Sequence, residues 1–247
     1  MMSLKTTNLI ETVKNQYFFK LKANIDSFSS LVGIQILAIL FSLGGVGSSG
    51  MGGAEISVNV KHYSSDMIFV FTLIWSFITA VTITTRPYRN HDFSFVSNRL
   101  SSSLSNILFL GTASLLGGVT CILSGNLVEI IANVFLNQQV YSLTGGASHI
   151  IFGIMITFFY LFLFSAIGYL VGTLVQVSKL FVIVLPVLFI GLLFLEASTS
   201  REPFLSNLFQ FFAMEPNISL FIVKMVLTSV ALFTVSLSIL NRLEVRR

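Results

Sequence analysis

The stretch IIFGIMITFFYLFLFSAIGYLVGTLV, residues 150–175, contains no charged side chain and exceeds the ~20 apolar residues that carry a helix across a bilayer. Five further apolar stretches lie at 28–47, 67–84, 104–124, 180–195 and 218–240. Backbone amides in hydrocarbon must be satisfied within their own segment, and the two-residue alternation of a barrel strand is missing. The sequence therefore predicts an all-α, polytopic membrane protein with six transmembrane helices.

Composition points to the same class of protein. Hydrophobic residues make up 54% of the chain, charged residues 10%, and the mean hydropathy is +0.89, which excludes an ordinary soluble domain. The sequence pI near 9.3 is explained by membrane orientation and anionic lipid, so we expect lipid contact and no nucleic-acid partner. The single cysteine, Cys121, lies in the third apolar stretch and is expected to be a buried small residue.

Basic residues gather on one side of the apolar stretches. The chain has 14 Lys and Arg residues, and only Lys61 and Arg201 lie in the connections of the other side. By the positive-inside rule, both termini lie in the cytoplasm and the protein resides in a cell membrane. The residues that set this orientation are Lys5, Lys14, Lys20, Lys22, Arg86, Arg89, Arg99, Lys179, Arg242, Arg246 and Arg247.

The chain divides into an N-terminal arm (1–27), a membrane bundle (28–240) and a cytoplasmic tail (241–247). The arm is too long and too polar to be the basic segment of a cleavable signal. Its apolar residues recur every three or four positions, which predicts an amphipathic helix along the cytoplasmic membrane surface. These residues are Leu9, Ile10, Val13, Tyr17, Phe18 and Leu21.

The outer connections differ from one another. GGVGSSGMGG, residues 44–53, predicts a flexible loop. Residues 126–139 have one apolar helical face and either rest at the outer interface or extend the third span. PFLSNLFQFF, residues 203–212, is too short to cross and too apolar for water, which predicts a dipping or interfacial helix.

No catalytic or metal-binding residues are expected. A nucleotide-binding G-x-x-x-x-G-K-[ST] loop is missing, and the three histidines lie on loops of opposite sides. An intramembrane protease would need paired carboxylates, histidines or a Ser/His pair at membrane depth, which the spans lack. Lys224 is the exceptional charge inside a span, and it either snorkels to the outer interface, to Glu215 or to Glu196, or contacts a substrate. Pro186, Glu196 and Lys224 form the candidate pathway or outer gate.

The connection TTRPYRNHDFSFVSNRLSSSLSN, residues 84–106, combines charges and aromatic residues at the highest density in the chain. Pro87 ends or bends the second span, and Asn90 or Asp92 can cap a short helix that carries Phe93 and Phe95. Arginines at an interface also suit a plain membrane anchor. Two phenylalanines in a polar loop favour docking to a protein groove over contact with lipid.

A surface helix comes before the first span, a docking segment lies between the second and third of six crossings, and an interfacial hairpin precedes the sixth. Together these features resemble the type-2 permeases of ATP-binding-cassette exporters. RPYRNHDFSFVSNRL, residues 86–100, is similar to the same connection in small Gram-positive permeases that export antimicrobial peptides or give immunity to them. The resemblance implies a coupling helix that enters a groove of a separate ATPase subunit. The residues to which it assigns this role are Arg86, Tyr88, Arg89, His91, Asp92, Phe93 and Phe95.

The resemblance also implies partners and a function. ATP and Mg would bind the ATPase subunits, with no cofactor on this chain. A second permease copy or a related permease would complete the pathway in a Gram-positive cell membrane. The cargo would be an amphipathic or antimicrobial peptide or a lipid-like molecule. The alternative is a membrane anchor or immunity protein that binds a peptide or partner without transport or ATP coupling.

Overall fold

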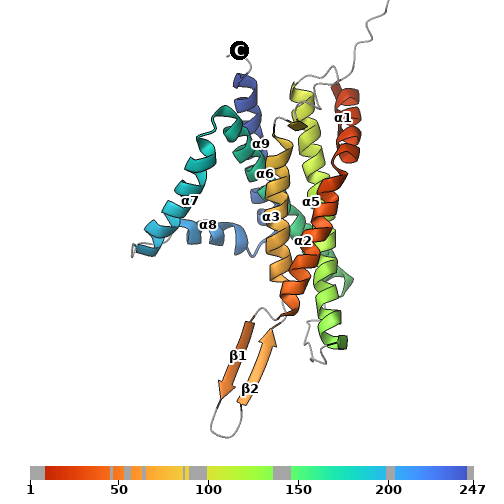
Figure 1. Ribbon diagram of the computed structural model, residues 1–247, viewed down its shortest axis with the longest axis vertical. Coiled ribbons are helices and arrows are strands. Elements are labelled where there is room, and N and C mark those ends of the chain that lie inside the picture. Colours follow the sequence, from red (N-terminus) through yellow and green to blue (C-terminus); the bar gives the residue numbers. More distant parts are fainter. Residues whose placement is uncertain are drawn as a thin grey trace, which may run out of the picture.

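The computed structural model describes residues 9–44, 47–52, 57–62, 65–85, 87–88, 99–135, 146–198 and 204–243. This described part forms eight helices and one two-stranded hairpin (Figure 1). The helices are α1 (Leu9–Ala23), α2 (Ile25–Leu43), α3 (Asp66–Ile83), α5 (Arg99–Phe135), α6 (Ala147–Val177), α7 (Phe181–Ser198), α8 (Phe204–Ala213) and α9 (Ile218–Leu243). The strands are β1 (Gly47–Gly52) and β2 (Ser57–His62).

Five of the six predicted apolar stretches form helices long and apolar enough to cross a membrane. They are Ile25–Leu43, Asp66–Ile83, Leu100–Phe135, Ala147–Val177 and Ile218–Leu240. The chain is therefore a multi-pass membrane protein. The remaining stretch, 180–195, lies in α7. The apolar part of this helix, Phe181–Glu196, falls short of the ~20 residues that a crossing needs. Six crossings are thus not confirmed.

The contact between α3 and α6 forms the centre of the bundle and depends on two glycines. A Cβ atom added at Gly168 would lie 2.5 Å from the backbone oxygen of Phe77, and one at Gly172 would collide with Thr84. Their four-residue spacing places both on one face of α6, as in the small-x-x-x-small pattern of membrane helix pairs. The missing side chains allow the two backbones to approach closely.

Hydroxyl groups join the same helices in the core. Ser76 of α3 donates to the backbone oxygen of Leu161 at 2.7 Å, and its Oγ lies 2.7 Å from the Oγ of Ser165. Ser114 of α5 lies 3.3 Å from that same Ser165 hydroxyl. All three serines are at most 2% exposed, so α3, α5 and α6 share one buried polar contact. Interhelical hydrogen bonds of this kind fix the rotation of membrane helices against each other.

The predicted N-terminal helix exists, but it is placed differently from the prediction. α1 continues almost in line with α2 after a break at Asn24 and packs along α5 (Figure 1). Its buried residues are Val13, Gln16 and Lys20. Hydrogen bonds from Lys20 to α5 replace the expected contact with a flat membrane surface. We call the end of the bundle where α1 lies the α1 end.

The Gly-rich connection between α2 and α3 is an antiparallel hairpin, so the predicted loop was wrong. Gly47 pairs with His62 and Gly52 with Ser57. In β2, Val58 and Val60 alternate with polar residues, which is a strand pattern. Backbone hydrogen bonds between the strands give the Gly-rich partner its order without a core. The hairpin projects from the end of the bundle opposite α1 (Figure 1).

Three further predictions concern the outer connections. Residues 126–135 continue α5 without a break, so this part extends the third span. The predicted short helix at 203–212 corresponds to α8, which runs crosswise between α7 and α9 (Figure 1). α7 leans away from the other helices and keeps most of its side chains exposed, including Val187 at 62% and Phe194 at 72%.

Candidate functional site

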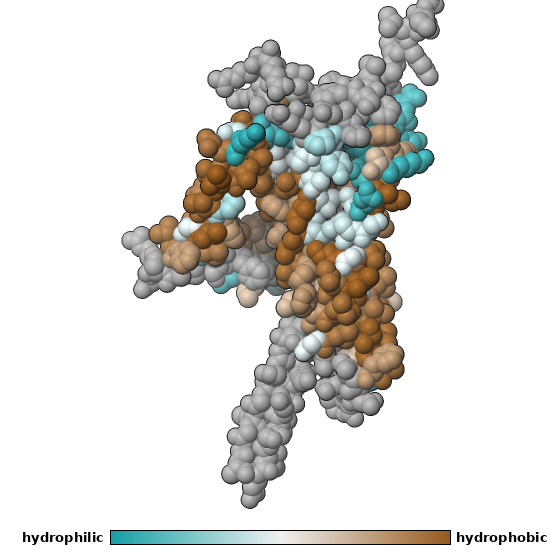
Figure 2. All heavy atoms as spheres, viewed as in Figure 1, coloured by the Kyte–Doolittle hydropathy of each residue, from teal (hydrophilic) through white to brown (hydrophobic). Residues whose placement is uncertain are grey.

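Two hollows in the described bundle are candidates for function. A polar pocket of about 200 Å³ lies at the α1 end, and an apolar cavity of about 800 Å³ lies between α3, α6, α8 and α9. Hydrophilic residues gather over α1 in Figure 2, whereas hydrophobic residues cover the lower part of the bundle. The first hollow therefore belongs to a hydrophilic end of the molecule and the second to its apolar body.

Tyr88 connects the polar pocket with the predicted coupling segment. α3 ends at Ile83, a turn at Thr84 and Thr85 follows, and Pro87 and Tyr88 are helical again. Proline lacks an amide hydrogen and disfavours helix at the residue before it, which explains why α3 does not continue. Six of the predicted coupling residues lie outside the described residues: Arg86, Arg89, His91, Asp92, Phe93 and Phe95.

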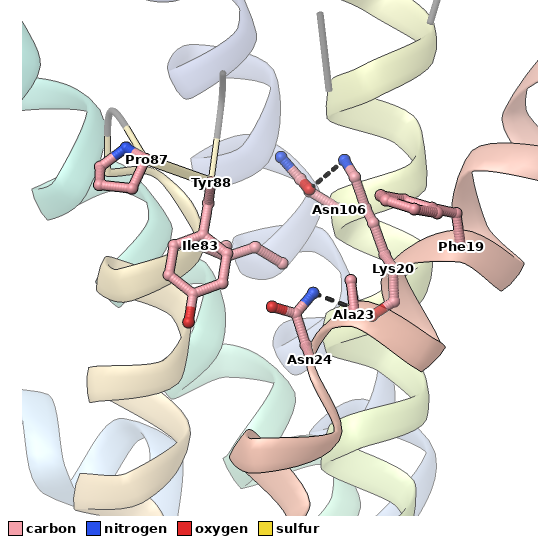
Figure 3. A pocket seen from close by; sticks show the side chains of 8 residues that line it. All are labelled: Phe19, Lys20, Ala23, Asn24, Ile83, Pro87, Tyr88 and Asn106. Carbon is pink, nitrogen blue, oxygen red and sulfur yellow. Dashed lines mark hydrogen bonds between the residues drawn. The ribbon is translucent and has the colours of Figure 1, made fainter. Parts of the chain in front are cut away.

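The pocket is formed by side chains from four parts of the chain (Figure 3). α1 ends beside α5, and the Asn24 break lets α2 start in a slightly different direction. The end of α3 and the turn after it close the opposite side. The lining residues are Phe19, Lys20, Ala23, Asn24, Ile83, Pro87, Tyr88 and Asn106.

Lys20 is the buried cation of this pocket, with 4% of its surface exposed. Its ammonium donates to the backbone oxygen of Ser102 at 3.0 Å and to Oδ1 of Asn106 (Figure 3). A buried ammonium without such acceptors would cost several kcal/mol, on the order of the penalty for an unpaired charge. Lys20 therefore fastens α1 to the first turns of α5.

Two asparagines of the pocket are tied to Lys20. Asn106 accepts a hydrogen bond from the Lys20 ammonium with its Oδ1. Asn24 donates its amide nitrogen to the backbone oxygen of Lys20 at 2.9 Å. Asn106 and Asn24 are only 7% and 5% exposed.

The apolar cavity is nearly free of polar groups. Its lining residues are Phe69, Leu73, Tyr160, Leu163, Phe164, Ile167, Leu208, Phe212, Thr228, Ala231, Leu232 and Val235. Tyr160 donates its hydroxyl to the backbone oxygen of Phe212 at 3.0 Å, which holds the end of α8 against α6. Such a cavity suits an apolar or amphipathic molecule, since it offers contact area and few hydrogen bonds.

Lys224 makes an ion pair with Glu215, one of the two carboxylates predicted from the sequence. Its ammonium also lies 4.0 Å from the ring centroid of Phe211, in cation–π contact. The other two candidate gate residues lie on α7, with Pro186 inside the helix and Glu196 in its last turns. Two of the three predicted gate residues thus lie on α7 and the third on α9. The contacts of α7 are mainly with α6 and α8.

Apart from Tyr88, the residues of the polar pocket were not predicted as site residues. Lys20 was assigned to the lipid surface, and Asn24 and Asn106 were given no role. The signal was present in the spacing: Gln16, Lys20 and Asn24 lie four residues apart on one face of the N-terminal helix, and all three are buried. Ser102 and Asn106 have the same spacing on α5.

No known protein family, no curated protein and no solved structure matches this chain.

Proposed function

We propose that the chain is the membrane permease of an ATP-binding-cassette exporter, which forms the substrate pathway and couples to a separate ATPase. One observation carries this proposal. The connection after α3 carries Pro87 and Tyr88 at the α1 end, where they line one pocket together with residues of α1 and the start of α5. A partner that grips the connection 84–99 would therefore act directly on three helices.

The apolar cavity supports an amphipathic cargo. Its volume of about 800 Å³ and its lining by aromatic and aliphatic residues suit a lipid-like molecule or the apolar face of an antimicrobial peptide. One side of the cavity is bounded by α8, which the Tyr160 hydrogen bond holds against α6. A second permease copy, or a related permease, would complete the pathway.

In this proposal the chain itself is no enzyme. Two ATPase subunits would bind ATP and Mg and would hydrolyse the nucleotide, and the complex would reside in the cell membrane of a Gram-positive bacterium. The coupling contact would be made by Tyr88 and by the sequence around Phe93 and Phe95. The aromatic side chains would enter the ATPase groove, and the arginines around them would add charge complementarity.

The alternative is an anchor or immunity protein that binds a peptide without ATP coupling. The observation that favours it is the apolar cavity itself, because such a hollow can hold a peptide side chain or an acyl chain without any motion of the bundle. The two functions differ in one measurable property, which is the association of ATP hydrolysis with the purified chain.

The experiment is co-purification. The tagged full-length chain is extracted in mild detergent from the cells that express it, and ATP hydrolysis by the eluate is measured. We expect vanadate-sensitive hydrolysis with the wild-type chain and its loss with Phe93→Glu/Phe95→Glu. Phe135→Glu is the matched control, because Phe135 is 78% exposed at the far end of α5. Hydrolysis that is absent, or equal in all three preparations, would favour the anchor.

A further inference from the structure

We propose that the apolar cavity binds a single-chain anionic amphiphile, such as a long-chain fatty acid, and that Lys224 binds its charged group. This ligand is the cargo class of the proposed function, and its export rests on that function. Its binding does not, because the chain alone carries both the cavity and the cation.

Lys224 extends the face of α9 that lines the cavity. Four lining residues of α9 recur every three or four positions or lie side by side on one helical face, from Thr228 to Val235. Lys224 lies on this face, four positions before Thr228, whose hydroxyl donates to the Lys224 backbone oxygen at 2.7 Å. Side chains of a helix lean toward its N-terminus. The ammonium therefore lies just beyond the Thr228 end of the cavity.

α8 bounds the cavity and also contacts the ammonium. Leu208 and Phe212 of α8 line the cavity, and the ring of Phe211 lies 4.0 Å from the Lys224 ammonium. The rings of Phe211 and Phe212 meet edge to face, with centroids 5.0 Å apart. One aromatic ring thus separates the ammonium from the cavity wall. The flexible four-carbon stem of lysine can cover such a distance.

The charge of Lys224 lies inside an apolar segment. The residue belongs to Ile218–Leu240, one of the helices long and apolar enough to cross a membrane. Ionisable residues at such positions are rare and usually mark the path of a substrate or an ion. Glu215, its ion-pair partner, lies in the connection between α8 and α9, outside the helices that line the cavity. A ligand that lies along α9 therefore meets the cation first.

The free capacity of the ammonium favours an anion. An ammonium has three N–H donors. Lys224 uses one for Glu215, and its next acceptor, the backbone oxygen of Phe211, lies at 3.5 Å, beyond the usual ~2.7–3.2 Å. A ligand carboxylate can bind beside Glu215 or replace it. A cationic head group would be repelled by the ammonium, and a neutral one would gain no charge-assisted hydrogen bond.

The interior of the cavity favours an alkyl chain. The lining contains two hydroxyl groups, and both already bond to the backbone: Tyr160 to Phe212 and Thr228 to Lys224. The remaining lining side chains are aliphatic or phenylalanine. The volume of about 800 Å³ lies in the range of ~300–1,000 Å³ that sites for small molecules have. We therefore commit to one chain, since the two chains of a phospholipid need twice the apolar space.

The test is native mass spectrometry of the purified full chain with oleic acid, oleylamine or oleyl alcohol at neutral pH. The three probes share one alkyl chain and differ in the charge of the head group. The wild-type chain should retain one oleate with at least about tenfold preference over each of the other two. Equal retention of the three probes overturns the proposal. Displacement of oleate by an equal concentration of dioleoyl phosphatidylglycerol overturns the single-chain ligand.

Two variants should change the affinity for oleate in opposite directions. Lys224→Met removes the cation and should lower this affinity about tenfold or more. Glu215→Gln removes the competing carboxylate and should raise it about threefold or more. Both variants break the same ion pair, so a purely structural role would move the affinity in one direction, which would overturn the proposal. If Lys224→Met fails to fold, the double variant should bind oleate and oleyl alcohol equally, and a remaining preference for oleate overturns the role of Lys224.

A third variant tests the cavity itself. Ala231→Trp fills part of the cavity and should lower the affinity for all three probes at least about tenfold. Val230→Trp is the matched control on the same helix, because Val230 is 50% exposed and outside the lining, and it should bind like the wild type. Equal affinities of these two variants overturn the cavity as the site. Oleate binding without co-purified ATP hydrolysis would contradict the proposed export and leave the binding site in place.

Discussion

The ion pair between Lys224 and Glu215 lies next to α8 and shows what single side chains contribute there. The two side chains are 25% and 15% exposed, so each is largely removed from water. Phe211 lies under the ammonium and contributes its ring face and its backbone oxygen. Glu215 lies in the connection between α8 and α9, so the ion pair ties this connection to α9, and the Phe211 contact ties α9 to α8.

The pair can be tested with two variants. Lys224→Met should insert into the membrane normally, but it leaves the Glu215 carboxylate without its cation. We expect a loss of stability of about 1–3 kcal/mol in this variant. Glu215→Gln added to Lys224→Met removes the unpaired charge and should restore most of the loss. Thermal unfolding of the purified chain measures both, and a double variant no more stable than the single one would exclude the ion pair as the cause.

The polar pocket shows which part of a site a sequence can predict. Tyr88 was assigned to the coupling segment from the sequence, and the structure places it across the polar pocket from α1. Lys20 looked like a lipid-facing lysine, because a basic residue near an apolar stretch usually is one. Its acceptors, Ser102 and Asn106, lie more than 80 positions away in the chain. The four-residue spacing of Gln16, Lys20 and Asn24 marks one polar face of α1, but which helix covers that face follows from helix packing and leaves no local pattern.

Among the helix pairs, α3 and α6 approach each other most closely at glycines of α6. Gly168 approaches the backbone of Phe77, which cannot rotate away as a side chain could. Gly33 of α2 has no atom within 4 Å of the position where its Cβ would stand. The two glycines therefore have opposite roles, although both lie inside apolar helices.

Alanine substitution separates these roles. Gly168→Ala should destabilise the protein by about 1–3 kcal/mol, because the added methyl group forces the two helices apart. Gly33→Ala is the matched control and should be neutral or stabilising by up to about 1 kcal/mol, since alanine is the better helix former. The midpoint of thermal unfolding distinguishes the two. Equal midpoints would show that α3 and α6 pack less closely than described.

Element types were more predictable than element ends. All six apolar stretches gave helices, five of them long enough to cross, since a run of uncharged residues in hydrocarbon has no alternative to internal hydrogen bonds. α5 begins at Arg99 and ends at Phe135, well beyond the predicted 104–124, because polar residues at a membrane surface continue a helix as readily as apolar ones. The hairpin was missed because glycines have no side chains whose alternation could be recognised.

At the scale of the whole molecule, orientation in the membrane is the property that the charge pattern predicts. The sole cysteine, Cys121, is 2% exposed, so the wild-type chain should react little with thiol reagents. Lys61→Cys and Arg201→Cys should react with a membrane-impermeant maleimide added to intact cells. Arg89→Cys should react only after permeabilisation. The reverse pattern of labelling would place both termini outside the cell.

Trp75 gives the molecule an optical consequence. It is the only tryptophan of the chain, and it is 4% exposed between α2, α3 and α5. Its indole nitrogen donates to the backbone oxygen of Ser27 at 3.1 Å and to the hydroxyl of Ser30 at 3.0 Å. Any motion that parts α2 from α3 must break these bonds and change the surroundings of the indole ring. The tryptophan fluorescence of the unlabelled protein should therefore change when α2 and α3 separate, and no second indole contributes to the signal.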